Sequence, residues 1–152
     1  MKIKNLYFSP VKSLSFNNVD TLEIIKNIGI KNDRIFAFSN NLNIKDIELI
    51  KNNPLKREIY KFLSLKKYPE LNEYNFLLEN NFLILEFENK IILKTDINNQ
   101  HEVKILCSKL EDMLPNINNI NLLKDSMNPF FDTMPNKSIS LINLNSIKDF
   151  EK

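Results

Sequence analysis

The chain has 152 residues, of which 43% are hydrophobic and 26% are charged, and its formal net charge is +2. This length and composition are typical of one globular domain that can bury a core without disulfides. The single glycine excludes glycine-rich phosphate loops, the single cysteine excludes an internal disulfide, and the mixed charge does not indicate nucleic-acid binding.

We also expect no membrane segment, because the sequence shows neither a signal peptide nor an apolar run of about 18 residues. The expected compartment is therefore the cytoplasm.

The N-terminal third of the chain predicts three strands. The first is expected over residues 2–11, where Pro10 ends the pairing because it has no N–H to donate. Two more strands are expected over residues 19–25 and 34–39, which are rich in β-branched and aromatic side chains. The connection between them contains Gly29, for which we expect a positive φ.

The middle of the chain changes from a helical to a strand pattern. Apolar residues recur every three to four positions over residues 44–62, which predicts two short helices divided by Pro54. Strands are then expected over residues 74–78, 82–87 and 90–94, as a meander with turns rich in Asn and Glu.

The last third predicts one long helix and further short elements. Residues 100–114 carry the apolar stripe of an amphipathic helix, and Cys107 lies in that stripe. A strand is expected over residues 120–123, another over residues 138–142, and a helix from Leu144 onward.

Two motifs in the N-terminal third resemble the MOSC family of molybdenum-cofactor proteins. In the N-terminal β-barrel region of that family, one strand ends in Tyr-Pro-Val-Lys-Ser and a later strand opens with Gly-Asp-Arg and an aromatic residue. Residues 9–13 here read Ser-Pro-Val-Lys-Ser, and Gly29 is followed by Asp33, Arg34 and an aromatic residue. The resemblance extends along the chain: residues 62–71 are similar to the family's Phe-Leu-Thr-x-Arg-x-x-Pro-x-Leu element, and residues 138–147 look like the opening of the MOSC domain proper.

The resemblance implies a mainly β (α+β) fold, a distorted β-barrel-like antiparallel sheet with flanking helices. It implies a MOSC N-terminal β-barrel domain over residues 1–125 and the start of an incomplete MOSC domain over residues 126–152. In such proteins, which include the amidoxime-reducing component and the molybdenum cofactor sulfurase, the two regions together hold molybdopterin. The full-length protein would be an oxidoreductase or a sulfurtransferase, with a redox partner protein in the first case. The family's Cys would lie beyond Lys152, so these 152 residues alone are expected to be inactive.

The resemblance also implies that Lys12, Ser13, Arg34 and Lys66 contact the pterin or its phosphate. Chemistry agrees, because a phosphate dianion without a glycine loop or a metal needs an ammonium, a hydroxyl and a guanidinium around it. Lys66 stands where the family has Arg, and it would offer a point charge in place of a fork. We expect no catalytic residue and no metal ligand within this chain.

The proposed contacts require a particular arrangement of strands. If the first and third strands are antiparallel neighbours, the end of one lies beside the start of the other, and Lys12, Ser13 and Arg34 converge on one concave surface. Asp33 is expected to position the loop that carries Arg34.

Other interpretations of the same residues remain open at this point. The chain could be a stand-alone anion- or protein-binding β module without catalytic activity, or a small nucleic-acid-binding barrel, which would need exposed aromatics on a basic face. Lys12 and Ser13 could form only a solvated turn, and the pairs Lys56-Arg57 and Lys66-Lys67 are expected to be solvated. A buried structural role is predicted for Cys107, and a surface position for the single histidine, His101.

Overall fold

The computed structural model of the chain describes residues 3–14, 16–54, 57, 61–114 and 116–131. The predicted strand over residues 138–142 and the helix expected from Leu144 lie outside the described residues. The second domain expected over residues 126–152 is described only as far as Phe131.

Two short hairpins form at the N-terminus. Strand β1 (Leu6–Phe8) pairs antiparallel with β2 (Asn17–Val19), and β3 (Ile24–Ile25) pairs antiparallel with β4 (Gly29–Ile30). The prediction of one strand over residues 19–25 was wrong, because the chain leaves the first hairpin after Val19 and begins the second at Ile24. Gly29 has a φ of 114°, which confirms the positive φ expected there.

The central pair joins distant parts of the sequence. Strand β5 (Phe36–Asn40) is antiparallel to β9 (Ile120–Lys124), with Phe36 opposite Lys124 and Asn40 opposite Ile120. Alternate side chains of both strands point to opposite faces, so Phe36 and Phe38 enter one apolar cluster while Ala37 enters another.

Helix α1 (Ile44–Asn52) confirms the first of the two helices predicted between residues 44 and 62. It begins at Asn43, whose side chain accepts the backbone N–H of Asp46, while the Asp46 carboxylate accepts the backbone N–H of Asn43. The predicted second helix lies mostly outside the described residues. A 3₁₀ helix, η3 (Pro69–Glu73), leads into the following sheet.

The predicted meander is present as a three-stranded sheet of β6 (Tyr74–Glu79), β7 (Phe82–Phe87) and β8 (Lys90–Asp96). Its second turn, Glu88-Asn89, has positive φ at both residues, which matches the right-handed twist of the strands that it joins.

The long predicted helix is also confirmed, as α2 (Gln100–Met113). The side chain of Asn99 accepts the backbone N–H groups of His101 and Glu102 at its start. Leu106, Cys107 and Leu110 are buried on its apolar face.

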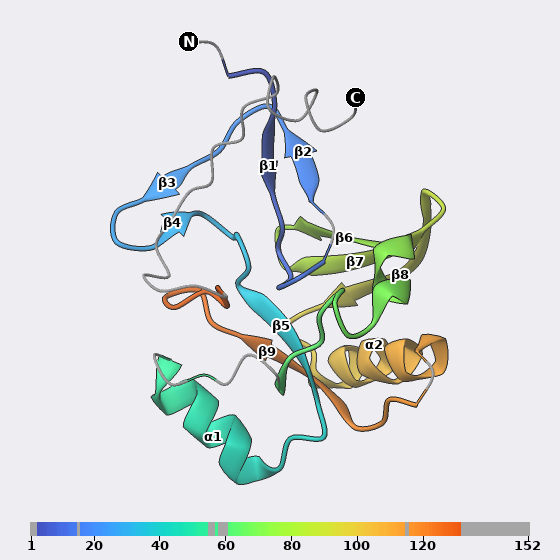
Figure 1. The fold of residues 1–152 in the computed structure, drawn as a ribbon. Helices are drawn as coiled ribbons and strands as arrows, with labels where there is room; N and C mark the ends of the chain where they lie inside the picture. The colour runs from blue at the N-terminus through green and yellow to red at the C-terminus, as the bar shows by residue number, and fades with distance from the viewer. Residues whose placement is uncertain (1–2, 15, 55–56, 58–60, 115, 132–152) are drawn as a thin grey trace.

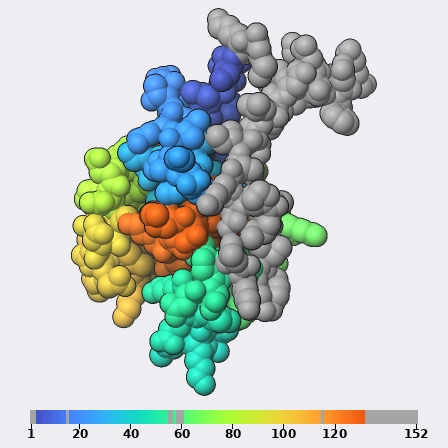
Figure 2. Space-filling view, turned by 90° about the vertical axis from the view of Figure 1, so that its left-hand side faces the viewer, coloured from blue at the N-terminus to red at the C-terminus, as the bar shows by residue number. Residues whose placement is uncertain are grey.

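The strands therefore build small antiparallel sheets rather than one continuous sheet, and two α-helices flank them (Figure 1). The described residues form no closed barrel. The larger apolar cluster lies between β5–β9, the meander and α2, and the smaller one lies on the α1 side of β5–β9. In the space-filling view, the segment around β9 lies between the N-terminal hairpins and α1 (Figure 2). None of the described helices is long and apolar enough to cross a membrane.

Candidate anion site at the start of β5

The chain just after β1 runs beside the start of β5. The backbone N–H of Phe36 donates to the carbonyl of Pro10 at 3.0 Å, and the N–H of Lys12 donates to the carbonyl of Phe36 at 2.8 Å. The resulting bridge between Val11 and Phe36 is parallel, so the antiparallel arrangement expected from the sequence was wrong. The predicted neighbours still meet, because the chain pairs with β5 only after it has passed the end of β1.

Pro10 is compatible with this ladder because the ladder uses its carbonyl alone. Proline has no N–H, and in this register the donors come from Phe36 and Lys12. Pro10 ends the pairing with β2, as predicted, and the chain changes its partner strand at that residue.

Arg34 lies at the point where the chain enters β5. Its φ is 51°, in the left-handed region, and its backbone is held on both sides. Its N–H donates to the carbonyl of Ser9, and its carbonyl accepts the N–H of Phe130 at 2.8 Å. Three segments that are distant in sequence are thus joined at one residue.

Ser13 has the same unusual backbone conformation, with a φ of 58°. Outside glycine, the positive φ angles of the described residues otherwise belong to seven asparagines and to Glu88 in its hairpin turn. Asparagine tolerates this region, whereas serine and arginine are held there at a cost of order 1–2 kcal/mol. Two of the four predicted site residues are therefore strained, a condition common in binding sites.

Asp33 connects the two strand ends through its carboxylate. Its Oδ1 accepts the backbone N–H of Ser9 at 3.0 Å, and its Oδ2 accepts from Arg34, at 2.9 Å from Nε and also from Nη2. Asp33 is 3% exposed, so this carboxylate is buried but fully engaged. These bonds support the expectation that Asp33 positions the loop.

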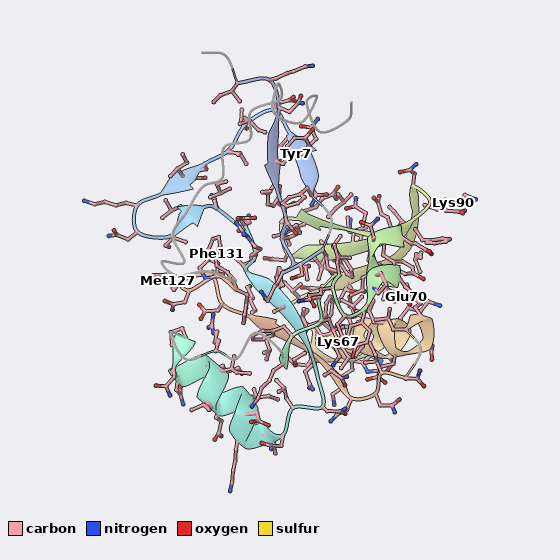
Figure 3. The ribbon with its side chains drawn as sticks, viewed as in Figure 1. Tyr7, Lys67, Glu70, Lys90, Met127 and Phe131 are labelled. Atoms are coloured by element: carbon pink, nitrogen blue, oxygen red, sulfur yellow. The ribbon has the colours of Figure 1, made fainter. Side chains whose placement is uncertain are left out.

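An aromatic ring covers the guanidinium of Arg34. Its Cζ lies 4.0 Å from the ring centroid of Phe131, within the range of a cation–π contact. Phe131 lies beside the entry of the chain into β5 (Figure 3). The Arg34 side chain remains 30% exposed.

Lys12 is buried, with 3% of its surface exposed, so a solvated turn is the wrong interpretation for this residue. Its Nζ lies 6.0 Å from the ring centroid of Phe62, and Phe62 packs edge-on against Phe130 with centroids 5.3 Å apart. The aliphatic stem of Lys12 thus lies toward the smaller apolar cluster, which contains both rings. Ser13, the next residue, is half-buried.

Lys66 lies apart from these residues along β5. Its loop contacts β5 through Leu63, whose N–H donates to Phe38 at 2.8 Å, and through Tyr68, whose hydroxyl lies 3.4 Å from the amide nitrogen of Asn40. Asn40 is about 13 Å along the strand from Phe36, where Lys12 pairs. The structure therefore brings Lys12, Ser13 and Arg34 to one strand end and leaves Lys66, which is exposed, beside the other.

Arg57 is buried, so the sequence-based expectation that it is solvated was wrong. Its side chain is 7% exposed rather than solvated, and its guanidinium pairs with the carboxylate of Asp125. It also donates to the carbonyls of Ile50, at 3.1 Å, and Asn128, and its Cζ lies 4.3 Å from the Phe130 ring centroid. Arg57 therefore fastens α1 to the segment that follows β9. By contrast, Lys66 and Lys67 are exposed, as expected.

Cys107 and His101 occupy the positions that the sequence predicted. Cys107 is buried against the larger apolar cluster, and burial raises the pKa of its thiol to about 11. A thiol of that kind is a poor nucleophile at neutral pH. His101 is exposed at the start of α2, and the described residues contain no group of three His, Cys, Asp or Glu side chains able to hold a metal.

A shallow depression of about 210 Å³ lies elsewhere, at the start of β6 and the turn after β7. It contains none of the predicted site residues; its lining is Asn72, Glu73, Tyr74, Asn75, Glu86, Glu88 and Asn89.

Comparison of the chain with protein-family models, with curated proteins and with solved structures gave no match. The sequence did not predict the contact of Phe131 with Arg34 or that of Arg57 with Asp125, because the partners in each pair lie far apart along the chain. An aromatic pair at Phe130-Phe131 after a predicted strand was the only available signal.

Proposed function

We propose that this chain forms one wall of a molybdopterin pocket in a redox or sulfur-transfer enzyme of the MOSC type. In this proposal Lys12, Ser13 and Arg34 hold the phosphate end of the cofactor. The observation that supports it most is the pairing of Lys12 with Phe36, because it brings the two motifs of the resemblance to one strand end.

The chemistry of the donors fits the anionic end of such a cofactor. An ammonium, a hydroxyl and a guanidinium belong to residues whose backbones are adjacent, and Asp33 pairs with the guanidinium. Cationic and hydroxyl donors of this kind favour a phosphate over a neutral ligand. The left-handed backbone of Ser13 and Arg34 is strain of the kind that binding sites retain.

The described residues offer no ligands for the metal end of the cofactor. The described part of the chain has no cluster of metal-ligating side chains, and Cys107 is buried in the core. The proposal therefore takes the sulfur ligand from a segment beyond Lys152, as the resemblance implies. When bound, the cofactor would supply the redox or sulfur chemistry. The residues of this chain would bind and orient it, and Lys66 receives no support as a fourth contact.

The barrel implied by the resemblance is part of the same proposal. Single bridges extend the pairing of β5 at two places, between Val11 and Phe36 and between Ser39 and Phe62, although Val11 and Phe62 belong to connecting segments and not to strands. The side-chain amide of Asn17 also donates to the carbonyl of Phe76 at 2.8 Å, which links β2 to β6. These links support a distorted, incompletely paired barrel. A cytoplasmic location and a redox partner protein belong to the proposal as well.

The test is to express the complete reading frame in a host that makes molybdopterin, and to measure co-purified pterin by fluorescence after oxidation and molybdenum by mass spectrometry. Arg34→Ala should lower both by roughly 10-fold or more, because a charge-assisted fork contributes about 1.5–3 kcal/mol. Lys31→Ala is the matched control, since Lys31 is an exposed cation three residues away that pairs with Glu23 and, among the described residues, forms no ion pair with Asp33.

Unchanged pterin and molybdenum in Arg34→Ala would overturn the assignment of Arg34. A wild-type protein that carries neither would overturn the cofactor proposal as a whole. If such a protein still bound phosphate, the chain would be the stand-alone anion-binding module instead.

A further inference from the structure

The guanidinium of Arg34 has two edges that can each bind an oxyanion with two parallel N–H bonds. One edge is formed by Nε and Nη2, and both of these atoms donate to the same oxygen of Asp33. The other edge is formed by Nη1 and the outer N–H of Nη2. Within the part of the chain that the structure describes, Nη1 has no hydrogen-bond partner. The Arg34 side chain is 30% exposed, so a ligand from solvent can reach it. The terminal edge is therefore the one that remains for a ligand.

Phe131 limits the movement of the Arg34 guanidinium out of its own plane. The ring contacts the face of the group, with its centroid 4.0 Å from Cζ, so the plane cannot tilt toward that side. Asp33 prevents rotation within the plane, because two nitrogens donate to its carboxylate. Together they fix the direction of the terminal edge before any ligand arrives, which lowers the entropy lost on binding.

The position of Phe131 is itself set by several contacts. The backbone N–H of Phe130 donates to the carbonyl of Arg34 at 2.8 Å, and the backbone N–H of Phe131 donates to the carbonyl of Pro129 at 3.0 Å. Phe130 is 3% exposed and anchors this end of the segment in the smaller apolar cluster.

The beginning of the same segment is fastened at Asp125. Its backbone N–H donates to the carbonyl of Ile35 at 2.9 Å, and its carboxylate accepts the backbone N–H groups of Met127 and Asn128 at 3.0 and 2.8 Å. Arg57 closes this turn from the side of α1. The ring that covers Arg34 is thus carried by an anchored loop.

We propose that Phe131 and Asp33 are positioning residues that hold Arg34 with its Nη1–Nη2 edge outward, as a two-pronged donor for the oxygens of one phosphate group. This inference rests on the proposed function only in that Arg34 binds an oxyanion, and it names the residues that prepare it to do so. A carboxylate offers the same two oxygens but half the charge of a phosphate dianion. The guanidinium edge therefore favours the phosphate, because its attraction to the ligand grows with the ligand's charge.

The test is a titration of the purified chain with inorganic phosphate and, separately, with acetate, followed by the ¹H–¹⁵N signal of the Arg34 side chain and by calorimetry. Wild-type protein should bind phosphate more tightly than acetate. Phe131→Leu should weaken phosphate binding roughly 3- to 10-fold, and Phe131→Tyr should stay within about 2-fold of wild type, because the ring and its charge distribution are retained. Arg34→Ala should abolish binding. Thermal unfolding of the two Phe131 variants provides the comparison of stability.

The outcomes separate the two proposals. If Arg34→Ala loses phosphate and Phe131→Leu does not, the positioning role of Phe131 is wrong and the role of Arg34 stands. If Phe131→Leu and Phe131→Tyr weaken binding equally, the ring only fills space and the inference fails. If wild-type protein and Arg34→Ala bind phosphate equally, or neither binds it, both this inference and the anion contact assigned to Arg34 are overturned.

Discussion

The carboxylate of Asp33 accepts the backbone N–H of Ser9 at 3.0 Å, across a sequence separation of 24 residues. The same carboxylate pairs with the neighbouring Arg34. One buried side chain therefore satisfies the backbone after β1 and orients the cation at the start of β5.

Replacing Asp33 should therefore destabilise the protein and not merely alter a surface charge. Asp33→Ala leaves the Ser9 N–H without its acceptor and Arg34 without its counter-charge, and we expect a loss of about 2–4 kcal/mol. Asp33→Asn keeps one acceptor oxygen for Ser9 and should lose less. Urea unfolding at pH 7 measures both variants, and an Asp33→Ala protein as stable as the wild type would contradict this account.

The Arg57–Asp125 pair should be strongly coupled. The two side chains are 7% and 18% exposed, so removing one leaves the other charge poorly solvated, at a cost of about 2–4 kcal/mol. A double-mutant cycle with Arg57→Ala and Asp125→Ala isolates the interaction. The Lys31–Glu23 pair is the control, because its side chains are 49% and 62% exposed and its coupling should stay below about 1 kcal/mol. Equal coupling energies for the two pairs would be the contrary result.

The thiol of Cys107 should make stability depend on alkaline pH. Burial raises its pKa from the ordinary value of 9.0 to about 11 in the folded chain, so the folded state favours the protonated thiol. The stability that the protonated Cys107 thiol contributes is complete below pH 9 and should be lost as the pH rises from about 9 to 11. Unfolding of wild type and Cys107→Ala, measured at several pH values, should show a difference that shrinks over this window. A constant difference would indicate an accessible thiol.

The start of α1 offers a test of local helix stability. Asn43→Ala removes the acceptor for the Asp46 N–H and should cost about 1 kcal/mol, whereas Asn43→Ser retains an acceptor and should cost a few tenths. Hydrogen bonds from Lys61 and from the backbone of Asn43 lower the pKa of Asp46 below its ordinary value of 3.8. The stability that Asp46 adds is therefore present above that value and lost as the pH falls through the folded-state pKa. Hydrogen exchange of the α1 amides measures both effects, and unchanged exchange in Asn43→Ala would exclude the capping role.

The elements that the sequence predicted well are those whose signal is local. The meander consists of short apolar segments separated by turns rich in Asn and Glu, and α2 has a clear period of 3.6 residues, so the signals for these elements lie within a few residues. The backbone of Gly29 could be predicted because glycine alone readily adopts its φ.

The features that the sequence could not supply depend on contacts between distant residues. The parallel bridge at Val11 depends on where the chain leaves β2, which no local pattern encodes. The burial of Arg57 depends on Asp125, a sequence separation of 68 residues, so the local pattern correctly described a charged residue and wrongly placed it in solvent. The face of Arg34 is covered by Phe131 for the same kind of reason.

The pairing of β5 with β9 also has a consequence during synthesis. Ser39 and Asn121 are 82 residues apart, so a ribosome that adds about 5–20 residues per second needs roughly 4–16 s to supply the partner strand. Through that interval β5 has an unpaired edge beside Phe36 and Phe38, two side chains that the finished chain buries almost completely. Nascent chains stalled before β9 should therefore be good clients for a ribosome-associated chaperone and should aggregate without one.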